Sequence, residues 1–375
     1  MPITLHWFLP TSGDGRDLVD VLSPDPGRAR GQRPPTLVYL AQIARAAEQV
    51  GFTGALTPTG LHCEDAWLTT MALSRESDRL KFLVAFRPGF LSPTLAAHQA
   101  ATYQRLTGGR LLLNVVTGGE AAEQRRFGDW LDHDERYERT SEFLTVLRGA
   151  WSGAPLTYTG RHYRVEGATV AQPPEPVPTI YFGGASFAAE RVAARHADVY
   201  LLWGETPAMV AERLERMRTR AAGLGRTIRF GIRLHVITRD TEAEAWTVAR
   251  RLLDRIDPES IARAQERFAA SESVGQHRMA SLHNGSRDGL EVTPNLWAGV
   301  GLVRGGAGTA LVGSHEQVAD RIEEYHRLGL DEFIFSGYPN LEEVYWFGEN
   351  VTPILHRRGL FDAQPAERSV AGRLG

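Results

Sequence analysis

The sequence predicts a (β/α)8 barrel, also called a TIM barrel, with insertions. Short apolar runs alternate with longer segments of helical period along most of the 375 residues, and eight such pairs can be recognised. Strands separated by helices form right-handed parallel units, and eight units close into a barrel of roughly 250 residues, which leaves the remainder for insertions. An open doubly wound sheet is the alternative. It is weakened because no Gly-x-Gly-x-x-Gly follows the first apolar run, where a dinucleotide site needs it.

The predicted strands are short and apolar, and each is followed by a segment with apolar residues at helical spacing. The strands are Ile3–Leu9, Thr53–Thr57, Lys81–Phe86, Leu111–Val116, Thr179–Phe182, Val199–Trp203, Arg229–Thr238 and Glu332–Ser336. The main helices are Leu37–Val50, Thr94–Leu106, Arg136–Leu147, Phe187–Arg195, Pro207–Ala222, Glu242–Asp254, His315–Leu328 and Leu341–Leu355.

We expect one barrel domain over residues 1–361 and a polar tail over 362–375. We expect three insertions, near 11–35, 151–178 and 257–313. The first is rich in Gly, Pro and Asp, and the second has the pattern of a hairpin followed by a proline-rich connector. The last begins as helix and ends in the glycine-rich segment NLWAGVGLVRGGAGTALVG around Arg304. Glycines give such a segment backbone freedom, and long irregular segments often form lids. We therefore expect a lid here.

Composition excludes several kinds of site. Of the 42 basic residues only Lys81 is lysine, which argues against Schiff-base chemistry and a lysine-bearing phosphate loop. Genome composition is the simplest explanation of that bias. The single Cys63 excludes a disulfide framework or a cysteine-ligated metal, and favours a cytoplasmic location. The net charge of −3 and the lack of a long apolar run indicate neither a nucleic-acid partner nor a membrane partner.

The active site of such a barrel lies at the C-terminal ends of its strands. The residues there are polar, cationic and aromatic, and they offer no trio of ligands for a metal. Arg233 and His235 share one face of a strand, and that face points into the barrel because Ile232 and its apolar neighbours occupy the other. The pair is suited to a tetrahedral oxyanion such as a sulfonate or phosphate. A buried ion pair with a carboxylate is the alternative.

The segment YFGGAS is the best phosphate candidate, because Gly184 allows close approach and Ser186 opens a helix with a positive N-terminus. His133 and Tyr137 share one helical face and could assist. An ordinary N-cap serine and a solvated helix start are the alternatives for these two segments. Cys63 could be a packing group or a site residue, and the Tyr338 phenol could donate to a ligand.

Other polar residues have simpler interpretations. Asp14 and the pair Glu342–Glu343 read as solvated loop or helix-start charges. The histidines that read as structural are His6, His98, His196, His326 and His356.

Several segments together resemble the reduced-flavin-dependent alkanesulfonate monooxygenases of the bacterial luciferase-like superfamily. They include WFLPTSGDG, LTPTGLHCEDAW, LKFLVAFRPG, YFGGAS, LLWGE, FGIRLHVITRD, SVGQHRM, NLWAGVGLVRGGAGTALVG and SGYPNLEE. The resemblance runs from about Ile3 to Leu355. It implies a cytoplasmic TIM-barrel enzyme, usually a homotetramer, that takes FMNH2 from a separate NAD(P)H:FMN reductase. With O2 it converts an alkanesulfonate to an aldehyde and sulfite, which supplies sulfur.

The resemblance also implies roles for individual residues. The positions matching the family's active-site set are Cys63, Trp203, Arg233, His235, Arg304 and Tyr338. The expected cofactor-binding residues are Ser186, Gly184, Tyr137, His133, Thr117 and Asn114. No metal is expected.

Two positions depart from the family pattern, because Ser12 and Asn340 stand where histidine is common, and the loop Arg16–Pro35 is longer. These changes bear on the substrate, which could be a sulfosugar such as sulfoquinovose. A deazaflavin-dependent hydride-transfer enzyme on the same barrel is a second alternative, and a non-catalytic flavin-binding or sulfonate-sensing protein is a third.

Overall fold

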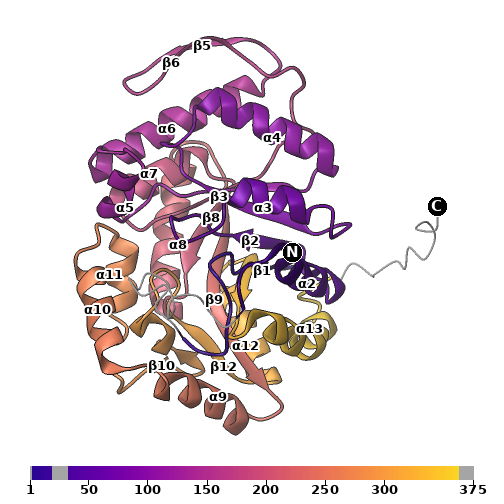
Figure 1. The fold of residues 1–375 in the computed structure, drawn as a ribbon, viewed down its shortest axis with the longest axis vertical. Helices are drawn as coiled ribbons and strands as arrows, with labels where there is room; N and C mark the ends of the chain where they lie inside the picture. Colours follow the sequence, from indigo (N-terminus) through magenta and orange to yellow (C-terminus); the bar gives the residue numbers. More distant parts are fainter. Residues whose placement is uncertain (1, 19–32, 363–375) are drawn as a thin grey trace, which may run out of the picture.

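A computed structural model describes residues 2–18 and 33–362 of the chain. Eight parallel strands form a closed barrel surrounded by helices (Figure 1), as the sequence predicts. The ring closes where β8 pairs with β9. Part of the first expected insertion (19–32) and the tail beyond 362 lie outside the described residues. The barrel strands are β1 (Thr4–Phe8), β2 (Gly54–Thr57), β3 (Lys81–Phe86), β4 (Leu111–Val115), β7 (Ile180–Gly183), β8 (Val199–Trp203), β9 (Arg229–Arg239) and β13 (Glu332–Ser336).

Most of the helices around the barrel begin after a residue whose side chain accepts a hydrogen bond from the first turn, whereas α5 and α13 do not. Asp132 and Glu135 form a capping box at the start of α6, and Ser186 caps α7. The helices around the barrel are α2 (Leu37–Gln49), α3 (Ala66–Leu73), α4 (Pro93–Thr107), α5 (Ala121–Arg126), α6 (His133–Ala150), α7 (Phe187–His196), α8 (Pro207–Ala222), α9 (Glu242–Asp254), α12 (His315–Arg327) and α13 (Asn340–Arg357).

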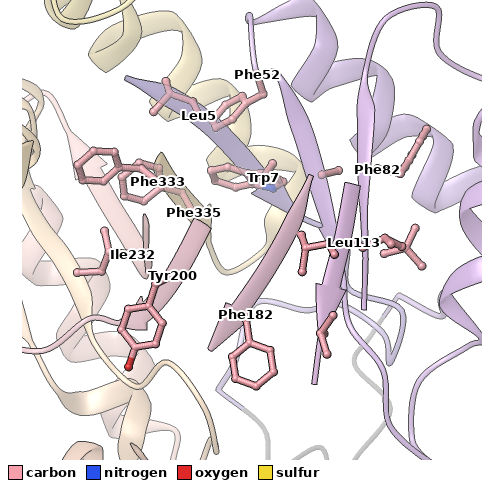
Figure 2. Close-up of a cluster of buried hydrophobic side chains, with 14 of the residues drawn as sticks. Leu5, Trp7, Phe52, Phe82, Leu113, Phe182, Tyr200, Ile232, Phe333 and Phe335 are labelled. Carbon is pink, nitrogen blue, oxygen red and sulfur yellow. The ribbon is translucent and has the colours of Figure 1, made fainter. Parts of the chain in front are cut away.

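The main core lies between the strands and the surrounding helices. Figure 2 shows part of it, with Trp7 beside Phe52 and with Phe333 beside Phe335. Because side chains alternate along a strand, the opposite faces fill the barrel. The buried residues of that inner cluster are Phe8, Leu56, Leu83, Leu112, Tyr181, Val199 and Ile334.

Two insertions have the predicted form in part. The segment near 151–178 contains the hairpin of β5 (Leu156–Thr159) and β6 (Arg164–Ala168). The segment near 257–313 begins with α10 (Pro258–Ala269) and α11 (Val274–Ala280). It then forms β10 (Glu291–Thr293), β11 (Leu296–Trp297), the 3-10 turn η1 (Gly299–Leu302) and β12 (Ala310–Ser314). Strand β12 was not predicted, and it lies parallel to the second half of β9.

The glycine-rich segment is largely buried, and residues 303–309 within it form no helix or strand. Of its glycines at 299, 301, 305, 306 and 308, Gly306 alone has a positive φ, of 86°. The Gly301 amide donates to the Gly308 carbonyl at 2.8 Å, and a Cβ on Gly308 would lie 2.8 Å from the Gly301 Cα atom. Gly308 is therefore required by close contact with the backbone of Gly301. Whether the segment moves as a lid stays a prediction.

A buried carboxylate joins the N-terminal ends of several barrel strands. Glu332 accepts hydrogen bonds from Tyr181 at 2.5 Å and His6 at 3.1 Å, and it forms an ion pair with Arg229. Burial acts to raise the pKa of Glu332, but the hydrogen bond from His6 and the positive charge of Arg229 hold it below its ordinary value of 4.5. The structural interpretation of His6 agrees with these contacts.

Glu332→Gln should therefore lower the free energy of unfolding at pH 7 by about 3 kcal/mol, as expected for the removal of one partner from a buried ion pair. A carboxylate with a lowered folded pKa stabilises above its unfolded pKa, and this contribution is lost as pH falls through the folded value. The difference between variant and parent should thus shrink below about pH 4. Urea unfolding of both proteins at several pH values measures this difference in the free energy of unfolding. Glu166→Gln, in the exposed pair with Arg164, is the control and should change stability by no more than about 0.5 kcal/mol. Equal effects at pH 7 and pH 3 would contradict the prediction.

Candidate active site

A cavity of about 310 Å³ opens among the C-terminal ends of the barrel strands. It extends from the start of α7, across the end of β4, to the ends of β2 and β3. Eight of the residues predicted from the sequence line it: Asn114, Thr117, His133, Tyr137, Gly184, Ser186, Trp203 and Arg233.

One end of the cavity has the features of a phosphate site. The Ser186 hydroxyl accepts from the Ala189 amide at the first turn of α7, and Gly184 has a φ of 136°. A Cβ at Gly184 would lie 2.6 Å from the Ala189 Cβ atom and 3.1 Å from the Tyr137 hydroxyl. Burial raises the pKa of Tyr137, whose hydroxyl interacts with Ser186, and the His133 ring lies 4.9 Å from the Tyr137 ring. Hydroxyls, a glycine cradle and a helix N-terminus fit the phosphate of a flavin mononucleotide.

Arg233 supplies a positive charge at the other end of the cavity. Its guanidinium carbon lies 4.2 Å from the centre of the Phe8 ring, inside the barrel. No carboxylate among residues 2–18 and 33–362 forms an ion pair with it, and its Nε atom has no partner there. Burial lowers the pKa of Arg233 to about 10, and the charge of Arg304 acts in the same direction. The alternative of a buried ion pair is therefore not supported within the described part of the chain.

The other predicted residues of this end adjoin Arg233. Arg304 donates to the Tyr338 hydroxyl at 2.8 Å, and the Tyr338 ring is stacked on the His235 ring with centres 5.3 Å apart. His235 Nε2 is 3.0 Å from the Ala307 carbonyl and its Nδ1 is 2.8 Å from the Ser336 hydroxyl. Burial and the charge of Arg233 lower the pKa of His235 well below its ordinary value, so the ring is neutral near pH 7. The positively charged groups here are thus Arg233 and Arg304. His235 is neutral and contacts the Ala307 carbonyl and the Ser336 hydroxyl.

Cys63 and Trp203 complete the predicted set. Cys63 is partly buried before α3, and its thiol interacts with Thr11 and lies within the electrostatic reach of Arg304. Burial raises the pKa of Cys63 to about 11, although Thr11 and Arg304 act in the opposite direction. The Trp203 ring packs against the insertion, where a Cβ at Gly275 would lie 3.1 Å from it.

Some predictions about nearby charges were wrong. Asp14 is not solvated, because it is 3% exposed and accepts from Tyr39 at 2.6 Å and from the Asn340 backbone amide at 2.8 Å. Glu343 is also buried, and it forms a two-bond ion pair with Arg239 at 2.6 and 3.0 Å. Local sequence could not reveal either contact, because the partners lie far away along the chain.

Residues that the sequence interpretation missed also shape the site. Glu205 lines the cavity and is bonded to Arg213 at 2.9 Å and to Arg278 of α11 at 2.7 Å. Gln276 Oε1 accepts from the Gly306 amide at 2.9 Å. These contacts hold the third insertion over the end of β8. Their only sequence signal was that Glu205 lies two residues after the end of the predicted strand Val199–Trp203.

The chain is thus a parallel α/β barrel whose cavity has the turn at residues 184–186 at one end and Arg233, without a carboxylate partner among the described residues, at the other. The model of the luciferase-like monooxygenase family matches residues 5–332, and the chain belongs to that family. One structure of the same fold is riboflavin lyase, with 21% sequence identity and a TM-score of 0.80 over 97% of this chain and 93% of the other. A second is the EDTA monooxygenase from Chelativorans sp. BNC1, with 20% sequence identity and a TM-score of 0.77 over 97% of this chain and 95% of the other. The structure of an F420-dependent secondary alcohol dehydrogenase is also similar, with 16% sequence identity and a TM-score of 0.68 over 96% of this chain and 100% of the other.

Within the described part of the chain, no helix is long and apolar enough to cross a membrane. No group of three or more His, Cys, Asp or Glu side chains there is arranged to hold a metal ion.

The raised pKa of Cys63 predicts how its thiol reacts. The thiolate is the reactive form, so the alkylation rate of the folded protein should rise about tenfold per pH unit from pH 7 to pH 10. In urea the same rate should level off near the ordinary pKa of 9.0. Mass spectrometry after timed iodoacetamide treatment measures one site, because the chain has one cysteine. A folded-state rate that levels off by pH 9 would contradict the assignment.

Proposed function

We propose that the protein is a two-component FMNH2-dependent monooxygenase that cleaves the C–S bond of organosulfonates. The observation that carries this proposal is a pair of arginines, Arg233 and Arg304, without carboxylate partners among the described residues, close to a cavity with a phosphate-type turn. A planar guanidinium donates two hydrogen bonds to an oxyanion and remains charged at neutral pH. The luciferase-like family membership supports oxidative chemistry.

The residues divide into two groups by the part of the reaction that they support. Ser186, Gly184 and Tyr137 would hold the flavin phosphate, with His133 beside them, and Thr117 and Asn114 would contact the rest of the cofactor. FMNH2, when bound, supplies the two electrons with which O2 is activated. A separate NAD(P)H:FMN reductase would provide it.

Arg233 and Arg304 would bind the sulfonate, with Trp203 and Cys63 lining the space around it. Tyr338 keeps the Arg304 guanidinium in place through its hydroxyl, and the buried neighbours Val303 and Ala307 exclude water. In the overall reaction one oxygen atom of O2 enters the aldehyde and the other forms water. The C–S bonding pair leaves with sulfite, and the carbon-bound hydrogen leaves as a proton.

Alkanesulfonates are the proposed substrates, and a sulfosugar such as sulfoquinovose is the alternative. The two departures from the family pattern differ in their surroundings. Asn340 is buried and bonded to Asp14, so its amide holds the first loop against α13. Ser12 is half-buried in that loop and is the departure that could contact a substrate.

The direct test of the proposal is the release of sulfite. Purified protein with FMN, NADH, a flavin reductase and O2 should release sulfite from octanesulfonate or from sulfoquinovose, measured with a thiol-reactive dye. Omission of the reductase should abolish the signal. If FMNH2 binds but no sulfonate yields sulfite, the reaction assignment is wrong. Binding of reduced F420 in place of FMNH2 would favour the hydride-transfer alternative.

The Arg304→Ala variant separates binding of the cofactor from catalysis. Sulfite release should fall by about 100-fold, because a charged donor to the reacting anion is lost, whereas the Kd for FMN should change by no more than about twofold. Arg304→Lys should recover part of the activity, since lysine keeps the charge but cannot donate as a fork. Arg164→Ala, on the exposed hairpin, is the matched control and should alter neither value. An equal loss of FMN affinity and turnover would make Arg304 a scaffold residue.

A further inference from the structure

Gln124 is a buried amide without a hydrogen-bonding partner. Its side chain lies on α5 and is 1% exposed, yet neither Oε1 nor Nε2 has a partner within the described residues. Its backbone is fully engaged, because the amide donates to Glu120 and the carbonyl accepts from Phe127 and Asp129. Buried amides without partners are rare, since each lost hydrogen bond is costly. The side chain therefore has free capacity for one donor contact and one acceptor contact.

The position of this amide connects it to the cavity. A Cβ atom on Gly118 would lie 1.8 Å from Gln124 Nε2, so the amide is pressed against the Gly118 backbone. Gly118 and Gly119 line the cavity between the phosphate turn and the end of β3. Any side chain at position 118 would close off this approach. The Gln124 amide therefore lies directly against the backbone of a residue that forms the cavity wall.

We infer that the Gln124 amide binds the imide edge of the cofactor ring. That edge presents an N–H donor between two carbonyl acceptors, and the side-chain amide offers the matching acceptor and donor. If Ser186 and Gly184 bind the flavin phosphate, the same cavity would hold the flavin ring, and the wall of that cavity includes Gly118. Flavins and the deazaflavin F420 share the imide edge, so the inference rests on the proposed cofactor site but not on sulfonate chemistry.

Gln104 provides a matched control. It is also 1% exposed, but its Nε2 donates to the Pro176 carbonyl at 2.6 Å and its Oε1 accepts from the Leu111 amide at 2.9 Å. Replacing an amide that has hydrogen-bonding partners leaves those buried partners without hydrogen bonds, which lowers the stability of the fold. Replacing an amide that has no partner by an apolar group leaves the stability unchanged or raises it. The two glutamines should therefore give opposite results.

The experiment compares stability and FMN affinity in the two leucine variants. Gln124→Leu should unfold at an unchanged or higher temperature in the absence of flavin, while its Kd for FMN, measured by fluorescence quenching, rises about tenfold. Gln104→Leu should unfold at a lower temperature and keep its Kd within about twofold. If Gln124→Leu does not fold, Gln124→Met serves the same purpose, since its side chain has nearly the same shape.

A modified ligand tests the contact itself. The parent protein should bind FMN about tenfold more tightly than N3-methyl-FMN, which lacks the N–H donor, and Gln124→Leu should bind both equally. If Gln124→Leu keeps the parent's FMN affinity, or if N3-methylation weakens both proteins alike, the inference is wrong and the proposed function stands. If F420 binds and FMN does not, the same comparison is made with F420. If neither binds the parent protein, both the proposed function and this inference fail.

Discussion

Arg233 and Arg304 carry positive charge at the mouth of the barrel, that is, at the C-terminal ends of its strands, without a carboxylate partner among the described residues. This charge constrains the structure around it. Arg233 lies inside the barrel, and Arg304 is close enough to lower its pKa further. Two like charges in a poorly solvated space are costly unless an anion joins them. A neutral His235 fits this arrangement, because a third charge would raise the cost. In the proposed function the sulfonate supplies that anion.

Three acidic residues around the site are already engaged in hydrogen bonds or ion pairs. Glu205 is held by Arg213 and Arg278, and Glu123 is held by Arg87 at 2.6 Å. Near the other side of the mouth, Asp14 accepts hydrogen bonds that include one from Asn340. These pairings leave the two mouth arginines without a carboxylate among the described residues. Most arginines are partners of acidic side chains or of carbonyl groups. The arginine-rich composition therefore does not show which arginines belong to the site, and the three-dimensional structure is needed for that.

The sequence predicted what depends on local periodicity. The barrel strands and helices follow from apolar spacing, and the inward direction of Arg233 follows from alternation along a strand. Strand β12 was missed because its glycine-rich surroundings resemble a loop, although it pairs with residues 235–239 of β9. The burial of Asp14 was missed because its partner Asn340 is 326 residues away. Such contacts arise from closure of the barrel, which brings the first and last strands together.

Closure also explains how Arg304 acquires a defined position on a glycine-rich segment. Two contacts from other elements fix the segment, because Ala307 accepts from His235 on β9 and Gly306 donates to Gln276 on α11. Within the segment, Gly301 donates to Gly308. The Arg304 guanidinium then reaches Tyr338 at the end of β13. A movement of the backbone at residues 306–307 would break the contacts to His235 and Gln276. A lid at this place would therefore act as a switch between two packed arrangements rather than as a freely mobile loop.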